Sequence, residues 1–119
     1  MCYKIIPTRK FEDDVEYYVR KKKFLHIIDD IERITNELKN GNLLGAPIPN
    51  LNIDTKEHTY KVRSANTDTK VGKSNGYRLI YYVIKDDKEI FLITIYYKKE
   101  DSRIPENSEI EQWVIKYCL

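Results

Sequence analysis

Basic residues suited to phosphate chemistry are concentrated in one short stretch of this 119-residue chain. Residues 61–78 hold five of the 21 basic residues but only one of the 19 acidic residues, so this stretch carries a formal charge of +4 and the rest of the chain −2. A local excess of this kind is typical of a site that binds a polyanion such as RNA. The five basic residues are Lys61, Arg63, Lys70, Lys73 and Arg78.

Strand geometry predicts that three of these cations meet. Successive side chains of a strand point to opposite faces, so Lys61 and Arg63 share one face, and Arg78 lies in the next predicted strand. If the two strands are neighbours, all three side chains can contact one phosphate. Fixed cations then bind the more highly charged transition state of phosphodiester cleavage more tightly than the ground state. The alternative is that they form a solvated sheet face or pair with carboxylates elsewhere.

Tyrosines accompany the cations in the predicted central strands. The chain has ten tyrosines, and the pairs Tyr81-Tyr82 and Tyr96-Tyr97 lie in those strands. A tyrosine on an exposed sheet face can stack on an RNA base, whereas its neighbour in the strand must point into the core. We therefore predict RNA contacts for Tyr82 and Tyr96.

Other kinds of site find little support in the sequence. The string Gly72-Lys73-Ser74 resembles the end of a phosphate-binding P-loop, but the required earlier glycine is missing and a strand follows in place of a helix. The two histidines have no partner at metal-ligand spacing, and the two cysteines lie at opposite ends of the chain. We expect free thiols, no metal and no cofactor.

The elements that position these residues form an α+β fold in a single predicted domain, residues 1–119. Thr8 is a predicted N-cap, Gly41 a helix C-terminal glycine, and Ser108 the start of a capping box that ends at Glu111. The predicted order is an N-terminal strand and a helical hairpin packed on a mainly antiparallel sheet, followed by a C-terminal helix. The expected elements are a strand at 2–7, helices at 9–22 and 25–40, a loop at 41–58, strands at 59–65, 76–85 and 89–98, and a helix from about 108.

Composition narrows the class of protein. Hydrophobic residues make up 41% of the chain and charged residues 34%, which is unlike a disordered tail or a membrane protein. No apolar run approaches the length of a transmembrane helix, and the N-terminus is too charged for a secretory signal. We therefore expect a cytoplasmic protein without a membrane partner.

Two motifs resemble the second half of RelE-type toxins, in the RelE/ParE superfamily of type II toxin–antitoxin modules. They are the Tyr-Lys-x-Arg strand at residues 60–63 and the Gly-Tyr-Arg-Leu-x-Tyr strand at residues 76–81. The run IFLITIYYKKED and the preceding helical hairpin are similar as well. The specific motifs cover about residues 59–99, and the predicted architecture fits the family along the whole chain.

The resemblance implies a ribosome-dependent endoribonuclease that cleaves mRNA without metal, through attack of the ribose 2′-hydroxyl. It implies that Lys61 transfers a proton and that Arg63, Arg78 and Lys98 hold the scissile phosphate. Lys99 lies beside Lys98 at the end of the last strand. The resemblance also implies a cognate antitoxin whose acidic, partly disordered segment covers the basic sheet face in a toxin–antitoxin hetero-oligomer. The predicted RNA-binding residues are Lys70, Lys73, Tyr82, Tyr96 and Lys99.

The sequence departs from this family at two places. Ile104 lies close to the position of a late catalytic tyrosine, and residues 65–75 form a longer connection between the motif strands. We predict that this connection contacts RNA through Lys70 and Lys73, the alternative being a longer turn. Two other functions stay open: a ParE-like toxin that poisons DNA gyrase, and a catalytically degenerate module that only binds its antitoxin.

Overall fold

The structure, a computed structural model, describes residues 2–54 and 58–119. Within these ranges, three helices and five strands follow the predicted order, apart from one additional short strand. Residues 55–57, which belong to the predicted loop 41–58, lie outside the described residues. The helices and strands are β1 (Lys4–Pro7), α1 (Arg9–Arg20), α2 (Ile27–Lys39), β2 (Ala46–Pro47), β3 (Thr59–Ser64), β4 (Tyr77–Ile84), β5 (Glu89–Tyr97) and α3 (Asn107–Cys118).

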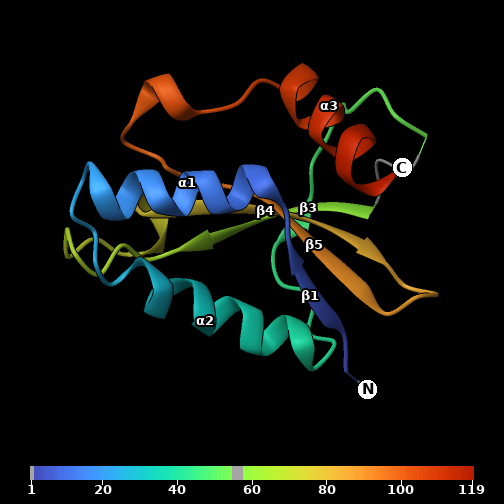
Figure 1. The fold of residues 1–119 in the computed structure, drawn as a ribbon, viewed down its shortest axis with the longest axis horizontal. Coiled ribbons are helices and arrows are strands. Elements are labelled where there is room, and N and C mark those ends of the chain that lie inside the picture. The colour runs from blue at the N-terminus through green and yellow to red at the C-terminus, as the bar shows by residue number, and fades with distance from the viewer. Residues whose placement is uncertain (1, 55–57) are drawn as a thin grey trace.

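The strands of the described chain form one sheet in the order β1-β5-β4-β3-β2. β1 runs parallel to β5, and the other neighbouring pairs are antiparallel. Helices α1 and α2 run in opposite directions on one face of the sheet, and α3 packs on the other face (Figure 1). The α+β fold with a mainly antiparallel sheet, a helical hairpin and a C-terminal helix is therefore confirmed. In the described ranges no helix has the length and apolar character needed to cross a bilayer.

The central strand β4 is buried on both of its faces. Leu79 and Tyr81 point into the core beneath α1 and α2, whereas Ile80 and Tyr82 point into the core beneath α3. Tyr82 is 3% exposed and the other three side chains are fully buried. Alternating residues of one strand can be apolar on both sides only when both faces are covered. The prediction of a strand covered from both sides is confirmed.

The predicted start of the first helix and the predicted end of the second are confirmed, whereas α1 ends two residues earlier and α2 begins two residues later than predicted. The Thr8 side-chain oxygen accepts a hydrogen bond from the Phe11 backbone N–H at 3.3 Å, as an N-cap does. The same hydroxyl donates to the Leu92 carbonyl at 2.8 Å, which ties the start of α1 to β5. After α2, Gly41 has a φ of +86°, the left-handed conformation that glycine adopts readily at a helix C-terminus.

The last helix begins earlier than predicted. Its N-cap is Glu106, and the Glu109 carboxylate accepts from the Glu106 backbone N–H at 3.0 Å, so the capping box spans these two residues. The capping box predicted from Ser108 to Glu111 is wrong. Glu111 instead accepts a hydrogen bond from the Asn52 backbone N–H at 2.6 Å, which fastens the preceding loop to α3.

The predicted loop contains the short strand β2. Its Ala46 and Pro47 pair with Lys61 and Tyr60 of β3. Gly45 has a φ of +85°, and a Cβ at this position would lie 2.2 Å from the Lys61 carbonyl oxygen. Only glycine therefore allows the loop to approach β3 this closely. A strand of two residues has no hydrophobic period, so the sequence pattern did not predict it.

Candidate functional site: a cationic pocket

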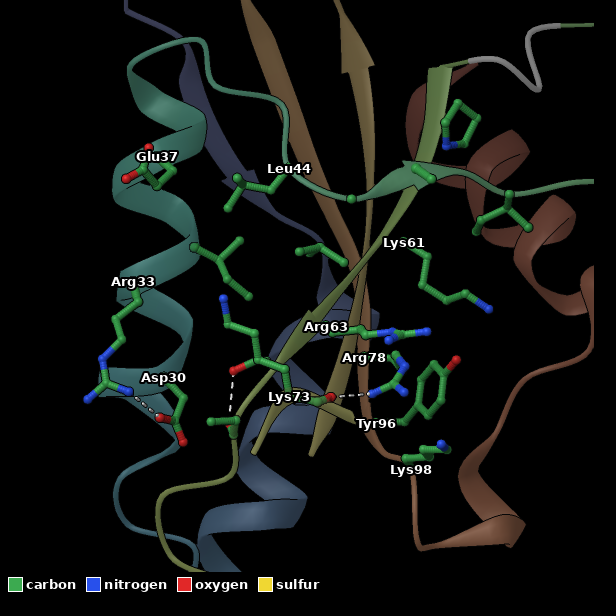
Figure 2. A pocket seen from close by; sticks show the side chains of 18 of the residues that line it. Asp30, Arg33, Glu37, Leu44, Lys61, Arg63, Lys73, Arg78, Tyr96 and Lys98 are labelled. Atoms are coloured by element: carbon green, nitrogen blue, oxygen red, sulfur yellow. Dashed lines mark hydrogen bonds and ion pairs between the residues drawn. The ribbon is translucent and has the colours of Figure 1, made fainter. Parts of the chain in front are cut away.

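A pocket of about 1110 Å³ lies along β3 and is lined by residues of α2, β2, β3, β4 and β5. Figure 2 shows Lys61, Arg63 and Arg78 on one side of β3, with Asp30 and Arg33 of α2 on the other. The pocket therefore has one wall of cations and one wall of mixed charge.

The register of the sheet brings the predicted cations together. Arg63 of β3 is the cross-strand partner of Arg78 in β4, and Arg78 is in turn the partner of Tyr96 in β5. Lys61 lies two residues before Arg63 and so on the same face. Lys98 follows directly after β5 and lines the same pocket. The predicted convergence of Lys61, Arg63 and Arg78 is confirmed.

Arg78 is the buried member of the cluster, with only 8% of the residue exposed. Its guanidinium donates hydrogen bonds to the carbonyls of Lys73 at 3.1 Å, Ser74 at 3.0 Å and Tyr77 at 3.1 Å. Burial lowers the pKa of Arg78, and the neighbouring Arg63 cation lowers it further. An arginine stays protonated despite such a shift, so the pocket contains a fixed positive charge.

The other cations are more accessible. Lys61 and Arg63 are exposed, and among the described residues neither forms an ion pair. The alternative that these cations are paired with carboxylates is therefore not observed in this part of the chain. Lys98 donates from Nζ to the Ser74 carbonyl at 3.0 Å, the same oxygen that Arg78 contacts. Positive charges from β3, from β4 and from the residue after β5 thus line one cavity, and no carboxylate of the described residues pairs with them.

The structure separates the predicted RNA-binding residues into three groups. Lys73 and Tyr96 line the pocket, and Tyr96 is 5% exposed beside Arg78. Burial raises the pKa of Tyr96, and the Arg78 charge opposes this shift. Lys70 and Lys99 are exposed but do not line the pocket. Tyr82 and Tyr96 were both expected on an exposed face, and this is wrong because both rings are buried in the core beneath α3, although Tyr96 still lines the pocket.

Several residues of the pocket were not predicted from the sequence. Arg33, Glu37 and Asn42 form part of its second wall, and Ile104 contributes an apolar contact from the connection after β5. The charged residues of α2 are equally typical of a solvated helix face, so their pattern in the sequence did not indicate that they line a pocket. The contribution of the carbonyls of residues 73 and 74 could not be predicted, because every residue has a backbone carbonyl whatever its side chain. The glycines at 72 and 76 indicate only that a turn lies there.

The acidic, histidine and cysteine side chains do not form a metal site in the described ranges. No three of them come close enough together there to hold a metal ion. The cations and the tyrosine that line the pocket can supply electrostatic stabilisation and proton transfer.

Fold and pocket together define the class: a small α+β protein with clustered cations along a sheet strand. No protein-family model matches the sequence, and the curated proteins give no significant match. Among solved structures, the chain is similar to the free state of an Escherichia coli RelE toxin carrying two arginine-to-alanine mutations. The two are 19% identical, the match covers 100% of each chain and the TM-score is 0.52. The isolated E. coli RelE toxin gives 18% identity, coverage of 98% of this chain and 99% of that chain, and a TM-score of 0.48. The chain has a RelE-like fold.

Proposed function

We propose that the chain is the toxin of a type II toxin–antitoxin module and cleaves ribosome-bound mRNA as a metal-independent endoribonuclease. The observation that carries the proposal is the pocket in which Lys61, Arg63, Arg78 and Lys98 converge without carboxylate partners among the described residues. The RelE-like fold and the two sequence motifs support the same function. The same proposal has the protein act in the cytoplasm, where it would meet ribosomes.

The proposed reaction breaks one phosphodiester bond. The ribose 2′-oxygen gives up its proton and bonds to phosphorus, while the 5′-oxygen of the next nucleotide leaves and takes up a proton. The products are a 2′,3′-cyclic phosphate and a 5′-hydroxyl. Lys61, exposed at the pocket wall, is the proposed proton-transfer residue. Arg63, Arg78 and Lys98 hold the non-bridging oxygens, whose negative charge grows in the transition state.

The remaining cations and one tyrosine are proposed RNA contacts. Lys73 and Tyr96 line the pocket and would contact nucleotides next to the scissile phosphate. Lys70 and Lys99 lie outside it and are proposed to contact the strand further away. The proposed antitoxin carries an acidic, partly disordered segment that covers the pocket in a hetero-oligomer, because it would neutralise the charges that RNA needs.

The proposal is tested by incubating the purified protein with ribosomes that carry an mRNA in the decoding site and mapping the 5′ ends of the products. The wild type should cleave. Lys61→Ala should cleave about 10²–10⁴-fold more slowly, as expected for loss of a proton-transfer residue. The matched control is Lys85→Ala, which removes an exposed lysine at the β4–β5 turn, outside the pocket, and should leave the rate unchanged.

Three outcomes would contradict the proposal. Equal rates for Lys61→Ala and the wild type would remove the assigned role of the lysine. Intact mRNA together with DNA breaks in expressing cells would favour gyrase poisoning. Intact mRNA with normal growth would favour a module that only binds its antitoxin.

A further inference from the structure

The long connection between β3 and β4 is an ordered turn. Asn66 is fully buried, and its backbone pairs with Val71 through two hydrogen bonds of 3.1 and 3.2 Å. The Asn66 side-chain oxygen also accepts from the Thr69 N–H at 3.2 Å. A Cβ at Gly76 would lie 2.0 Å from the Ser64 carbonyl oxygen, so the end of the connection presses directly against its beginning. We call residues 66–75 the clamp segment.

Two carboxylates attach the clamp segment to α2 and the turn before it. Asp30 is 1% exposed and accepts from both the backbone N–H of Thr67 at 2.9 Å and its hydroxyl at 2.5 Å. Asp68 accepts from the backbone N–H of His26 at 2.9 Å and contacts its ring Nδ1 at 2.8 Å. The segment is therefore fixed to the helix that forms the opposite wall of the pocket.

The far end of the clamp segment holds two of the pocket cations. The 3-10 turn Lys73–Asn75 directs its first two carbonyls at the Arg78 guanidinium, at 3.1 and 3.0 Å. The Ser74 carbonyl also accepts from Lys98 Nζ at 3.0 Å. A guanidinium has five N–H donors, and three of those of Arg78 are used by carbonyls of described residues. Two donors remain for a ligand.

These carbonyl contacts offset the repulsion between cations in the pocket. Arg63 and Arg78 are direct cross-strand partners, and like charges at such positions repel. A carboxylate beside them would remove the repulsion but also the positive charge. Carbonyl dipoles stabilise the cations and fix their direction while leaving the net charge in place, which is the preorganisation that electrostatic catalysis requires.

We propose that the clamp segment is a positioning device whose carbonyls at residues 73 and 74 hold Arg78 and Lys98 side by side, and that Asp30 and Thr67 are its positioning residues. This inference rests on the proposed function for its catalytic consequence, although not for the geometry. This positioning role is additional to the RNA contacts proposed for Lys70 and Lys73 in the same segment.

The first variant is Asp30→Asn, which keeps the shape of the side chain but cannot accept both Thr67 hydrogen bonds. Its matched control is Asp29→Asn, the same change at the neighbouring exposed position of α2. Because Asp30 is buried, Thr67→Val provides a second variant at an exposed position that removes only the hydroxyl contact. Thermal unfolding shows that each variant is folded.

The kinetic readout is single-turnover cleavage on programmed ribosomes. Asp30→Asn should lower the rate at saturation by about 10²-fold with a nearly unchanged half-saturating concentration, because the cations are misplaced and not removed. Thr67→Val should also lower the rate at saturation, but by a smaller factor than Asp30→Asn. Asp29→Asn should cleave at the wild-type rate. Folded clamp variants that cleave at the wild-type rate would overturn the proposal.

A second readout needs no RNA and separates this proposal from the proposed function. In ¹⁵N–¹H spectra of the free protein, the Arg78 guanidinium protons should exchange slowly in the wild type and in Asp29→Asn, and the slow signals should be lost in Asp30→Asn. If the wild type does not cleave mRNA but this pattern holds, the proposed function fails and the positioning role stands. Slow exchange retained in Asp30→Asn would overturn the clamp even if cleavage is observed.

Discussion

Arg78 is a buried residue that keeps its positive charge at the wall of the pocket. Its partners are carbonyl oxygens, which accept hydrogen bonds without cancelling the positive charge. Lys61 and Arg63 are exposed on the same face, so their side chains can adjust to a ligand while Arg78 stays fixed. A phosphate in the pocket would contact the fixed Arg78 and the more adjustable Lys61 and Arg63. We expect the first to orient the phosphate and the other two to strengthen its binding.

His26 gives a pH-dependent prediction at the same scale. Hydrogen bonding and proximity to the Asp68 carboxylate raise the pKa of His26. The ring–carboxylate interaction is therefore fully present below the ordinary pKa of about 6.5 and is lost as the pH rises through the higher folded-state value. Asp68→Asn should lower the melting temperature of the protein more near pH 6 than near pH 9.

The direct measurement is an NMR titration of the His26 ring. Its midpoint should lie above the ordinary value in the wild type and return toward it in Asp68→Asn. The amide keeps an acceptor for the His26 backbone N–H, so the variant removes the interaction between the ring and the carboxylate while this backbone contact can persist. A melting-temperature difference that does not change with pH would contradict the prediction.

At the scale of elements, the sequence was informative wherever a pattern repeated. The strands with apolar residues on both faces and the helices with one apolar stripe were predicted at the right places because burial imposes those periods. The helix ends at Thr8 and Gly41 followed from local hydrogen bonding and backbone conformation. The strand β2 has only two residues, so it shows no hydrophobic period in the sequence. Glu106 was missed as the N-cap of α3 because Ser108 followed by Glu111 fits the capping-box pattern as well.

The placement of side chains around the pocket was predicted only in part, and one rule explains both the agreement and the disagreement. Alternation along β3 and β4 placed Lys61, Arg63 and Arg78 on one face, which the pocket confirms. The same alternation put Tyr82 on that face, but it could not indicate how far α3 extends over the sheet. The second wall comes from α2, which is distant in sequence, and the carbonyls that hold Arg78 belong to the backbone. Neither the second wall nor these carbonyls could be predicted from the types of residue in the sequence.

Asp14 connects three elements and gives a prediction at this scale. It is 1% exposed and accepts hydrogen bonds from Thr94, from the Ile95 N–H at 3.2 Å and from Arg103 at 2.9 Å. It thereby joins α1 to β5 and to the connection that leads to Ile104 in the pocket. Asp14 also pairs with Lys10 Nζ at 2.5 Å. Asp14→Ala should lower the free energy of unfolding by about 3–5 kcal/mol, because two part-buried cations, Lys10 and Arg103, and two other donors lose their acceptor.

Urea unfolding measures this change, and the neighbouring position supplies the control. Asp13 is exposed and, among the described residues, pairs only with Arg9 in the preceding turn of α1. Asp13→Ala should therefore change the free energy of unfolding by no more than about 0.5 kcal/mol. Equal losses for the two variants would show that the Asp14 network does not hold these elements together.

For the whole molecule, the important property is an uneven distribution of charge. The net charge is only +2, yet residues 61–78 carry +4 and the rest of the chain −2. The fold gathers Lys61, Arg63, Lys73 and Arg78 from that stretch with Lys98 at one pocket. We therefore expect the field of the protein to attract polyanions to one place, where an acidic partner segment and an RNA strand would compete.

Competition and salt dependence test this property together. We expect a single-stranded RNA made resistant to cleavage by 2′-O-methylation to bind the wild type more weakly as salt rises, with a glutamate-rich peptide displacing it. Each cation that contacts a phosphate contributes about 0.7 to the slope of log affinity against log salt, so Lys61→Ala should reduce the slope by that amount. Lys85→Ala should leave it unchanged, since this lysine does not line the pocket. An identical slope in both variants, or RNA that stays bound when the peptide is added, would mean that the charge cluster is not where polyanions bind.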